Sequence, residues 1–453
     1  MKLLNVLLLI WLMVVNGIDF YREEMIRNDY KYELNVYHHL SGISPYFEMK
    51  KEELNDNLPS YCSIEKMIYL IRHGSVYVDD YDYDYFVKPF IKRLNKSLKL
   101  IRYKSVKVLF LSKWKSPFTN EKNQIEKLTR TGVLESFKLG VEFSYRYSNL
   151  LSKENRTSFH IWTSSSQRTK ETASYILKGI FPKRSVKDGI VSIGEEKFRG
   201  ANSLTPTKTC QKFTSSRGSK EANRWLNIYT KPIIKRLNSM IENHRFTAND
   251  IFAMQQLCGY ETAIRGSSPF CRLFRAEEWI SFEYYFDIKY HYELGYGNPL
   301  SPYLGIHWVK AMTDTFTSNH QHFYISVIHR EMLPIVLVAL GLYNSSNNPQ
   351  ENRMNLDRIW KTSEILPFLG RIQLELFSCS SIEFSGSFVR VIVNSNPKIL
   401  PGCSSGPGFS CPLAHFVKYV NQRYEIYQNF SQVCQFNQTK TFDHLTFYQN
   451  KSN

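Results

Sequence analysis

Three short hydrophobic runs, each followed by a polar cluster and then by a helical pattern, organise this 453-residue chain. They span residues 67–71, 159–162 and 323–328. Continuous apolar runs of this length are typical of strands that are buried on both faces, as in a parallel sheet covered by helices. In such sheets, chemistry collects at the carboxyl ends of the strands. All three polar clusters follow such ends, so we expect them to meet at one functional site.

The rest of the chain adds helices and two late strands to this sheet. Residues 373–377 and 388–393 alternate enough to supply the strands. The long segment between the second and third runs carries aromatic-rich helical patterns, which predict an inserted smaller helical domain. We therefore expect an α/β fold, a mainly parallel sheet covered by helices. The expected boundaries are an α/β core at roughly 60–90, 155–185 and 320–453, with helical insertions at roughly 91–150 and 190–315.

Residues 88–107 predict a basic amphipathic helix. The segment has eight Lys or Arg residues and no acid. Its apolar residues are at helical spacing, namely Ile91, Leu94, Leu98 and Ile101. Two interpretations are open: a solvated outer face, or a basic wall along the approach to a polyanion site.

The N-terminus predicts export. Residues 1–17 have one lysine, a short apolar run and a small residue at the end, as in a cleavable signal peptide. An uncleaved anchor is the alternative, but about 20 apolar residues are needed to span a bilayer and this run is shorter. No later segment is long and apolar enough to span, and the polar C-terminus resembles neither a lipid-anchor nor a retention signal. We expect a chain in the secretory pathway, secreted or endolysosomal, with no stable membrane span.

The cysteines and glycosylation sequons agree with export. Eight cysteines suggest four disulfide bonds in an oxidising compartment. Spacing alone suggests two local pairs, Cys258 with Cys271 and Cys403 with Cys411. No two cysteines have the close two-residue spacing of a zinc site, so no bound metal is expected. Asn-x-Ser/Thr sequons, candidates for glycosylation, begin at Asn95, Asn155, Asn344, Asn429, Asn437 and Asn450.

The chain is basic, with 58 Lys plus Arg, 41 Asp plus Glu and a formal net charge of +17. This balance favours a polyanionic partner: a phosphorylated small molecule, an anionic glycan, a membrane surface or a nucleic acid. Charge alone does not choose among these classes.

The first polar cluster is Arg72-His73-Gly74. The planar guanidinium of Arg72 can bind phosphate oxygens through two hydrogen bonds. A neutral imidazole at His73 can attack phosphorus and carry the phosphoryl group covalently. Gly74 permits a sharp turn, after which a helix N-terminus would offer backbone N–H groups to an anion. The alternative is a solvated turn without chemistry.

The second and third clusters supply a cation and an acid. Arg168 falls in the first turn of the helix after residues 163–166, where the helix dipole disfavours a cation unless an anion is bound. Pairing with Glu171 three residues later is the alternative. Glu331, two residues after His329, can protonate an alkoxide leaving group, and nearby phosphate oxygens would raise its pKa. The alternative there is a loop turn.

Together these motifs resemble the histidine acid phosphatase family, clade 2 of the histidine phosphatase superfamily, and most closely its multiple inositol-polyphosphate phosphatases. The matching motifs are Arg-His-Gly, Thr-Ser-Ser-x-x-Arg-Thr-x-x-Thr-Ala and a late His-x-Glu. The resemblance extends from about Cys62 to Cys434. It implies a phosphoglycerate-mutase-like fold, with residues 18–453 as the phosphatase domain. It also implies a secreted phosphomonoesterase that hydrolyses inositol polyphosphates and other phosphate monoesters through phosphohistidine, with no cofactor and no nucleic-acid partner.

The resemblance also implies a role for each site residue. His73 would be the nucleophile, and Glu331 would protonate the leaving oxygen and then activate water. Arg72, Arg168 and His329 would bind the transferred phosphoryl group. The implied disulfide bonds are Cys62–Cys379, Cys210–Cys434, Cys258–Cys271 and Cys403–Cys411.

The chain departs from the family in the first motif. The family has Arg-His-Gly-x-Arg-x-Pro, but here Val76 replaces the second arginine and Val78 replaces the proline. The acidic residues 79–84 that follow have two interpretations, a solvated loop or a rim that disfavours highly phosphorylated substrates. An alternative function therefore stays open, a catalytically weakened or inactive homologue that acts as a polyanion-binding secreted or surface glycoprotein.

Overall fold

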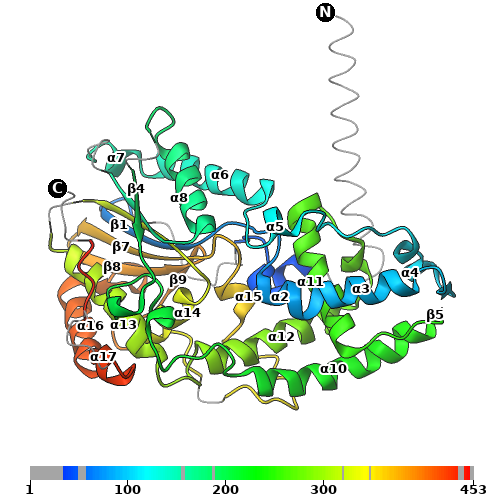
Figure 1. The fold of residues 1–453 in the computed structure, drawn as a ribbon. Coiled ribbons are helices and arrows are strands. Elements are labelled where there is room, and N and C mark those ends of the chain that lie inside the picture. The colour runs from blue at the N-terminus through cyan, green and yellow to red at the C-terminus, as the bar shows by residue number, and fades with distance from the viewer. Residues whose placement is uncertain are drawn as a thin grey trace, which may run out of the picture.

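The structure is a computed structural model that describes residues 34–48, 58–154, 159–185, 189–318, 321–345, 348–436 and 443–448. A mixed eight-stranded sheet forms its centre (Figure 1). Four adjacent strands run parallel in the order β1-β6-β3-β4. On the other side of β1 the strands run antiparallel. The strands are β1 (Cys62–Arg72), β3 (Ile161–Ser164), β4 (Ile190–Ile193), β6 (Phe323–Ile328), β7 (Arg371–Ser380), β8 (Ser385–Val393), β9 (Asn396–Lys398) and β10 (Cys411–Pro412).

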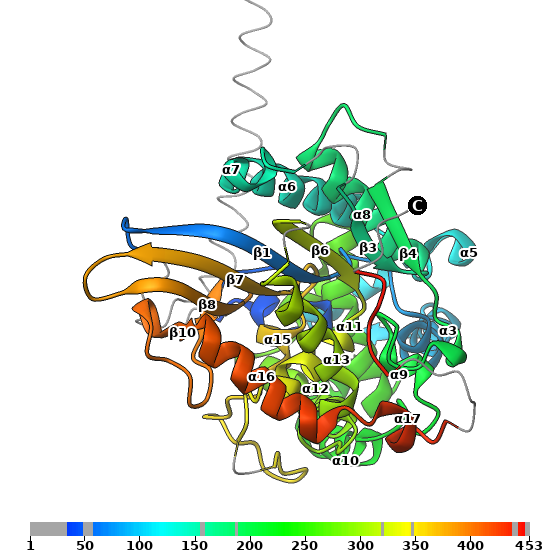
Figure 2. The ribbon, with the colours of Figure 1, turned by 90° about the vertical axis from the view of Figure 1, so that its left-hand side faces the viewer.

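Helices cover both faces of the sheet, as Figure 2 shows. Along β1, side chains alternate between two cores: Tyr69 and Ile71 belong to one, Ile68 and Leu70 to the other. The first core is closed by α6 and α8, and the second includes residues of α13, α14 and α16. These helices are α6 (Arg130–Arg146), α8 (Gln167–Ile180), α13 (Ser301–Thr315), α14 (Met332–Ala339) and α16 (Leu413–Tyr427).

Helices α6 and α8 cross closely because glycines meet at the contact. A Cβ on Gly140 would lie 2.1 Å from the Ile176 carbonyl oxygen, and one on Gly179 would lie 2.4 Å from that of Phe137. Only glycine permits this approach. The crossing places the N-termini of both helices beside the end of β1.

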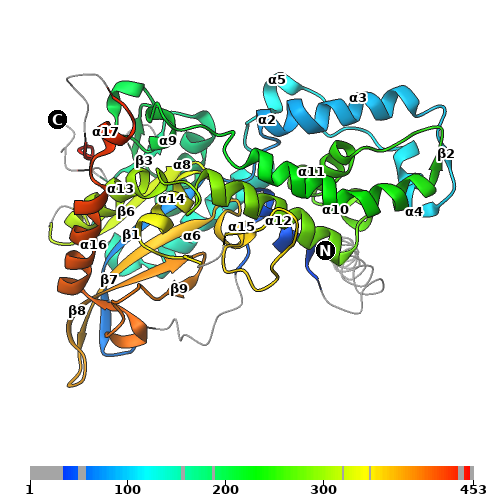
Figure 3. The same ribbon diagram turned by 90° about the horizontal axis from the view of Figure 1, so that it is seen from below.

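A second group of helices lies beside the sheet, seen most clearly in Figure 3. It comprises α3 (Lys88–Ser97), α10 (Ser219–Ser239), α11 (Ala248–Arg265) and α12 (Ala276–Glu293). A two-stranded sheet joins β2 (Arg102–Tyr103) to β5 (Ile241–Glu242) at its far end. The short helices are η1 (Val36–His39), η2 (Ser41–Ile43), α2 (Asp80–Asp82), η3 (Tyr83–Val87), α4 (Val106–Leu109), η4 (Phe110–Ser112), α5 (Glu121–Gln124), α7 (Ser148–Leu151), η6 (Lys197–Arg199), α9 (Pro206–Thr209), η7 (Pro269–Arg272), α15 (Thr362–Ile365), η8 (Pro407–Phe409) and α17 (Phe430–Val433).

The fold class expected from the sequence, a mainly parallel central sheet covered by helices, is confirmed. All five expected strands are present, although β3 begins at Ile161, two residues later than expected. The expected basic helix over residues 88–107 is too long. Helix α3 ends at Ser97, because the chain then turns and Arg102 and Tyr103 pair with β5.

The expected domain boundaries differ from the structure at two places. Helix α6 falls in an expected helical insertion, yet it covers the central sheet. Strand β4 lies outside the expected core, yet it pairs with β3. Position along the chain separates α6 and β4 from the expected core, whereas packing of α6 on the sheet and pairing of β4 with β3 make both elements part of it.

Four disulfide bonds join all eight cysteines, in the pairs that the family resemblance implies: Cys62–Cys379, Cys210–Cys434, Cys258–Cys271 and Cys403–Cys411. Among the sequons, Asn95, Asn344 and Asn429 are exposed. The expected signal peptide and the sequons at Asn155, Asn437 and Asn450 lie outside the described residues. Within the described part of the chain, no helix is long and apolar enough to cross a membrane.

Candidate active site

The three polar clusters meet at one edge of the sheet. Because β1, β6 and β3 are neighbours and parallel, their carboxyl ends lie side by side, with Arg72 opposite Ile328 and Thr163 opposite Val327. A narrow cleft opens at this edge. It is lined by Arg72, His73, Val76, Asp79, Glu126, Arg168, Tyr260, His329, Arg330, Glu331 and Phe368. All five site residues expected from the sequence are in this set.

His73 is buried and is held as a neutral imidazole with one free nitrogen. Its Nδ1 lies 2.9 Å from the Gly74 carbonyl oxygen, which can only accept, so Nδ1 carries the proton. Burial and the charges of Arg72 and Arg168 lower the pKa of His73 well below its ordinary value. Nε2 therefore keeps its lone pair, as a nucleophile requires.

Arg72 lies beneath His73 on the last residue of β1. Its Nη1 donates to the carbonyl oxygens of Gly42 and Leu366, and its guanidinium stacks 4.5 Å from the Phe368 ring centroid. Its buried Nε has no hydrogen-bond partner among the described residues. Burial and the charge of Arg330 lower the pKa of Arg72 to about 10, so it stays charged at neutral pH. Backbone carbonyls hold this cation, and among the described residues no carboxylate forms an ion pair with it.

Arg168 is the second residue of α8, where the dipole disfavours a cation. Its Nη1 lies 2.8 Å from Glu126 Oε1. The alternative partner considered from the sequence, Glu171, instead accepts from Gln167. Glu126 has a positive φ of 60°, an uncommon conformation for a residue other than glycine. Arg168, which shares the cleft with His73, thus already forms an ion pair with the Glu126 carboxylate.

His329 is the second histidine that lines the cleft. Its imidazole centroid lies 5.6 Å from that of His73, and its Nε2 is 3.0 Å from the Ser164 hydroxyl. Glu195 Oε1 lies 3.8 Å from the same nitrogen. Burial lowers the pKa of His329, although Glu195 raises it.

Glu331 is ionised in this arrangement. Burial raises the pKa of its carboxyl, but Arg330 and His329 lower it by more, and the pKa ends below the ordinary value. The sequence-based expectation of a raised pKa assumed a bound phosphate beside the carboxyl. In the structure the neighbouring charge is instead Arg330, whose Nε lies 3.2 Å from Glu331 Oε1.

The segment after Gly74 corrects one expectation. No helix begins directly after the glycine, because residues 75–78 are extended and pair with residues 126–129. Gly74 is required for another reason: a Cβ there would lie 2.8 Å from the Gly132 carbonyl oxygen in α6. Its N–H donates to the Thr172 hydroxyl of α8. The glycine therefore lets both helices approach the end of β1.

The acidic stretch is not a solvated loop, so that interpretation is wrong. It forms α2 and the start of η3, with two of its acids turned inward. Asp79 Oδ2 lies 3.2 Å from Arg330 Nη2, and buried Asp82 accepts a 2.6 Å hydrogen bond from the Tyr260 hydroxyl. Asp80 and Asp84 are exposed. The stretch thus supplies an acidic lining to the cleft.

A wider cavity of about 460 Å³ adjoins the cleft and shares Arg168, His329 and Glu331 with it. Its other polar lining residues are Lys208, Glu293, three threonines and one serine, namely Thr205, Thr207, Thr214 and Ser215. The Lys208 ammonium lies 2.6 Å from Glu195 Oε2, and this contact and the one to His329 outweigh burial and lower the pKa of Glu195 to about 2. The wall can therefore receive the polar remainder of a substrate whose reacting group enters the cleft.

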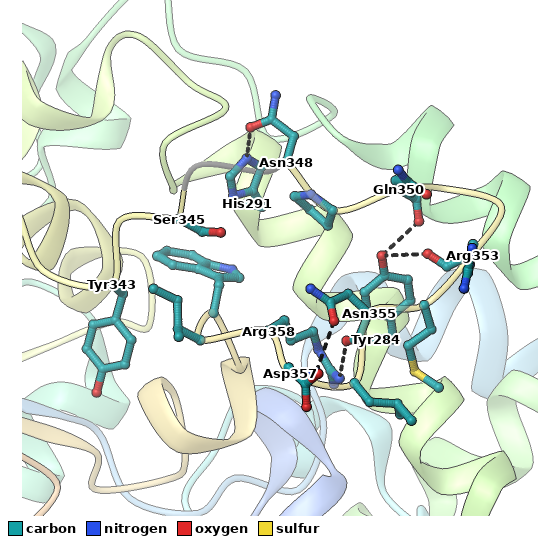
Figure 4. Close-up of a pocket in the computed structure, with 15 residues that line it drawn as sticks. Tyr284, His291, Tyr343, Ser345, Asn348, Gln350, Arg353, Asn355, Asp357 and Arg358 are labelled. Carbon is teal, nitrogen blue, oxygen red and sulfur yellow. Dashed lines mark hydrogen bonds between the residues drawn. The ribbon is translucent and has the colours of Figure 1, made fainter.

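Another cavity, of about 690 Å³, is drawn in Figure 4 and lies away from the three clusters. Some of its charged and polar groups are paired within the protein. Arg358 binds Asp287 and Glu283, and the Tyr284 hydroxyl donates to backbone carbonyls. Among its described lining residues, no arrangement of a nucleophile beside a general acid like that of His73 and Glu331 is present. Within the described ranges, no cluster of His, Cys, Asp and Glu could hold a metal ion.

Sequence reasoning missed three residues of this site. Arg330 is only the variable position of the His-x-Glu motif, although a charged residue just after β6 already indicates a place in the site. Glu126 reaches the site from the loop after α5 and Lys208 from the short helix α9, and no local sequence pattern marks either one.

Comparisons with known proteins identify the family of this chain. Residues 63–394 match the model of the histidine phosphatase superfamily (branch 2). The chain is 29% identical to a phytase of Candida albicans, covering 93% of this chain and 91% of the phytase. It is 30% identical to a thiamine-repressible acid phosphatase of Schizosaccharomyces pombe, covering 86% and 88%.

Solved structures share the fold. The phytase of D. castellii superposes with a TM-score of 0.84 at 23% identity, covering 94% of both chains. A Bifidobacterium longum multiple inositol polyphosphate phosphatase, solved with inositol hexasulfate, has a TM-score of 0.60 at 12% identity, covering 83% of this chain and 96% of its own. Taken with the match over residues 63–394, these findings show that the chain belongs to the histidine phosphatase superfamily, branch 2.

Proposed function

We propose that this chain is a phosphomonoesterase of the secretory pathway that hydrolyses inositol polyphosphates and other phosphate monoesters through a phosphohistidine. The observation that carries the proposal is His73, a buried neutral imidazole with a free Nε2 among arginines. The similarity of the chain to a phytase and to an acid phosphatase supports phosphate monoesters as the substrate class. The net charge of +17 suits a polyanion.

In the first step, His73 Nε2 forms a bond to phosphorus while the bond from phosphorus to the ester oxygen breaks. Arg72, Arg168 and His329 hold the phosphoryl oxygens and stabilise their charge. The negative charge of the bound phosphoryl group raises the pKa of Glu331, so the carboxyl is protonated in the complex and gives its proton to the departing alkoxide, which leaves as an alcohol. Glu126 already contacts Arg168 Nη1, so the phosphoryl group competes with this carboxylate for the Arg168 guanidinium.

In the second step, the Glu331 carboxylate takes a proton from water as the water oxygen attacks phosphorus. The phosphorus–nitrogen bond breaks, inorganic phosphate forms, and His73 returns to its neutral state. The adjacent cavity, with Lys208 on its wall, holds the remainder of the substrate.

A polyanion-binding role without catalysis is not favoured. Such a protein has no need of Glu331, an acid that would repel the ligand, nor of a nucleophilic nitrogen kept free of protons. We further propose that residues 18–453 act as one phosphatase domain, with glycans on exposed Asn95, Asn344 and Asn429.

The test is phosphate release from inositol hexakisphosphate and from 4-nitrophenyl phosphate. The native chain should hydrolyse both, and His73→Ala should hydrolyse neither while it keeps the native melting temperature within a few degrees. His415→Ala, an exposed histidine of α16, is the matched control and should keep native turnover. Native-like turnover by His73→Ala would refute the nucleophile assignment.

A further inference from the structure

Arg330 is a charged residue of the phosphoryl-binding cleft that the proposed mechanism does not yet use. Its side chain is 20% exposed and lines the cleft together with Arg72, His73, Arg168 and Val76. A Cβ built on Gly42 would lie 3.6 Å from Arg72 Nη1 and 4.0 Å from Arg330 Cδ, so the two arginine side chains converge on the same backbone. Both residues line the same mostly buried cleft, and the charge of Arg330 lowers the pKa of Arg72, so the two cations repel each other unless an anion lies between or beside them.

The carboxylates present hold Arg330 in position but do not use all of its donors. Asp79 faces Nη2 at 3.2 Å and Glu331 faces Nε at 3.2 Å. A guanidinium carries five N–H donors in a rigid fork. Among the described residues these contacts leave Nη1 without a carboxylate partner, so Nη1 remains available for an oxygen of a bound phosphoryl group.

Arg330 also stays fully charged. Burial lowers the pKa of its guanidinium, but Tyr290, Asp79 and Glu331 raise it by more. The Tyr290 ring lies 5.7 Å beneath the guanidinium carbon and limits its movement. A charged, oriented donor thus lies at the cleft that contains Val76, the position where the family resemblance calls for an arginine.

We propose that Arg330 is a substrate-binding residue that contacts the transferred phosphoryl group, and that it replaces the arginine absent at position 76. This inference rests on the proposed phosphomonoesterase function. Asp79 is the positioning residue of the pair, since it orients the guanidinium from the start of α2. The contact is to the transferred group, because Arg330 shares the narrow cleft with His73 and does not line the wider cavity that receives the rest of the substrate.

The test compares Arg330→Ala with the native chain on inositol hexakisphosphate, glycerol phosphate and 4-nitrophenyl phosphate. Loss of one charged clamp should lower kcat/KM by about 30- to 1,000-fold on all three substrates. The inhibition constant of inorganic phosphate should rise in parallel. Arg330→Lys should fall between, because it keeps the charge without the fork.

A double-mutant cycle with Val76→Arg tests the replacement itself. Val76→Arg should raise kcat/KM in the Arg330→Ala background. In the native background it should lower kcat/KM, since a fourth guanidinium would crowd and repel Arg72 and Arg330. The same effect of Val76→Arg in both backgrounds would overturn the replacement.

Arg236→Ala is the matched control. Arg236 is 17% exposed and paired with Glu278 away from the cleft, so its loss should lower the melting temperature without changing kcat/KM. If Arg330→Ala leaves the partly buried Asp79 unpaired and does not fold, the double variant Asp79→Asn with Arg330→Gln removes both charges and should show the same kinetic loss.

Two results would overturn the inference: Arg330 variants that behave like Arg236→Ala, and a loss confined to inositol hexakisphosphate, which would assign Arg330 to a distant phosphate. Failure here is distinct from failure of the proposed function. The latter requires that the native chain release no phosphate, or that His73→Ala remain active.

Discussion

Arg168 Nη1 lies 2.8 Å from Glu126 Oε1, so the arginine at the start of α8 already holds an anion that belongs to the chain. Glu126 comes from the loop that pairs with the extended segment after Gly74. Its side chain is 40% exposed and can turn toward solvent. A phosphoryl group and Glu126 therefore compete for the same guanidinium.

This competition predicts that Glu126→Gln strengthens phosphate binding. An exposed ion pair contributes about 0.2–1 kcal/mol, so the inhibition constant of inorganic phosphate should fall by about 1.4- to 5-fold. Glu121→Gln, which removes an exposed pair with Lys88 elsewhere, should leave it unchanged. A weaker affinity for phosphate in Glu126→Gln would show that Glu126 positions Arg168 and does not compete for it.

The role proposed for Glu331 predicts a dependence on the leaving group. Glu331→Gln should lower kcat/KM, which reports phosphoryl transfer to His73 and not the later attack of water, by about 100- to 10,000-fold on glycerol phosphate, because an alkoxide leaves poorly without a proton. On 4-nitrophenyl phosphate the loss should be much smaller, since nitrophenolate leaves as an anion. Steady-state kinetics on the two substrates measure the ratio, and equal losses would remove Glu331 from the general-acid role.

The pKa directions predict activity at acidic pH. His73 must be neutral, and its pKa lies well below 6.5, so activity should rise only as pH climbs through that low value. Glu331 must be protonated, and its pKa lies below 4.5 in the free protein, so kcat/KM on an alkyl phosphate should fall as pH rises through this range.

The measurement is a pH profile of kcat/KM on both substrates. The alkaline fall should be steeper for glycerol phosphate than for 4-nitrophenyl phosphate, and it should move to higher pH in Arg330→Lys if the weaker fork holds the Glu331 carboxylate less well. An optimum near neutral pH for the alkyl substrate would contradict the assignment of Glu331.

The disulfide bonds should contribute unequally to stability. Cys62–Cys379 closes a sequence separation of 317 and Cys403–Cys411 one of 8. In the loop-entropy model the longer loop stabilises the folded state by about 3 kcal/mol more. Replacing each pair by alanine and measuring urea unfolding should show the larger loss for Cys62 and Cys379. The reverse order would mean that native contacts, and not unfolded-state entropy, determine the difference.

Hydrophobic pattern alone determined much of this protein. The runs at 67–71 and 323–328 are apolar on both faces, and only a strand between two helical layers can bury both. The polar residues directly after such strands had to meet at one edge, since parallel strands end together. His73, Arg168 and Glu331 were therefore identifiable as one site before any coordinates.

Only the tertiary structure decided which charged residues lie around that site. Arg330 and Asp79 lie 251 positions apart in the chain, yet they form an ion pair in the cleft. Glu126 reaches Arg168 only because its loop pairs with the segment after Gly74. The sequence shows that Val76 lacks a charge, but it does not show which charged residue of another segment lies near Val76 in the folded chain. Electrostatic interaction depends on separation in space and on burial, and both arise only when the chain is folded.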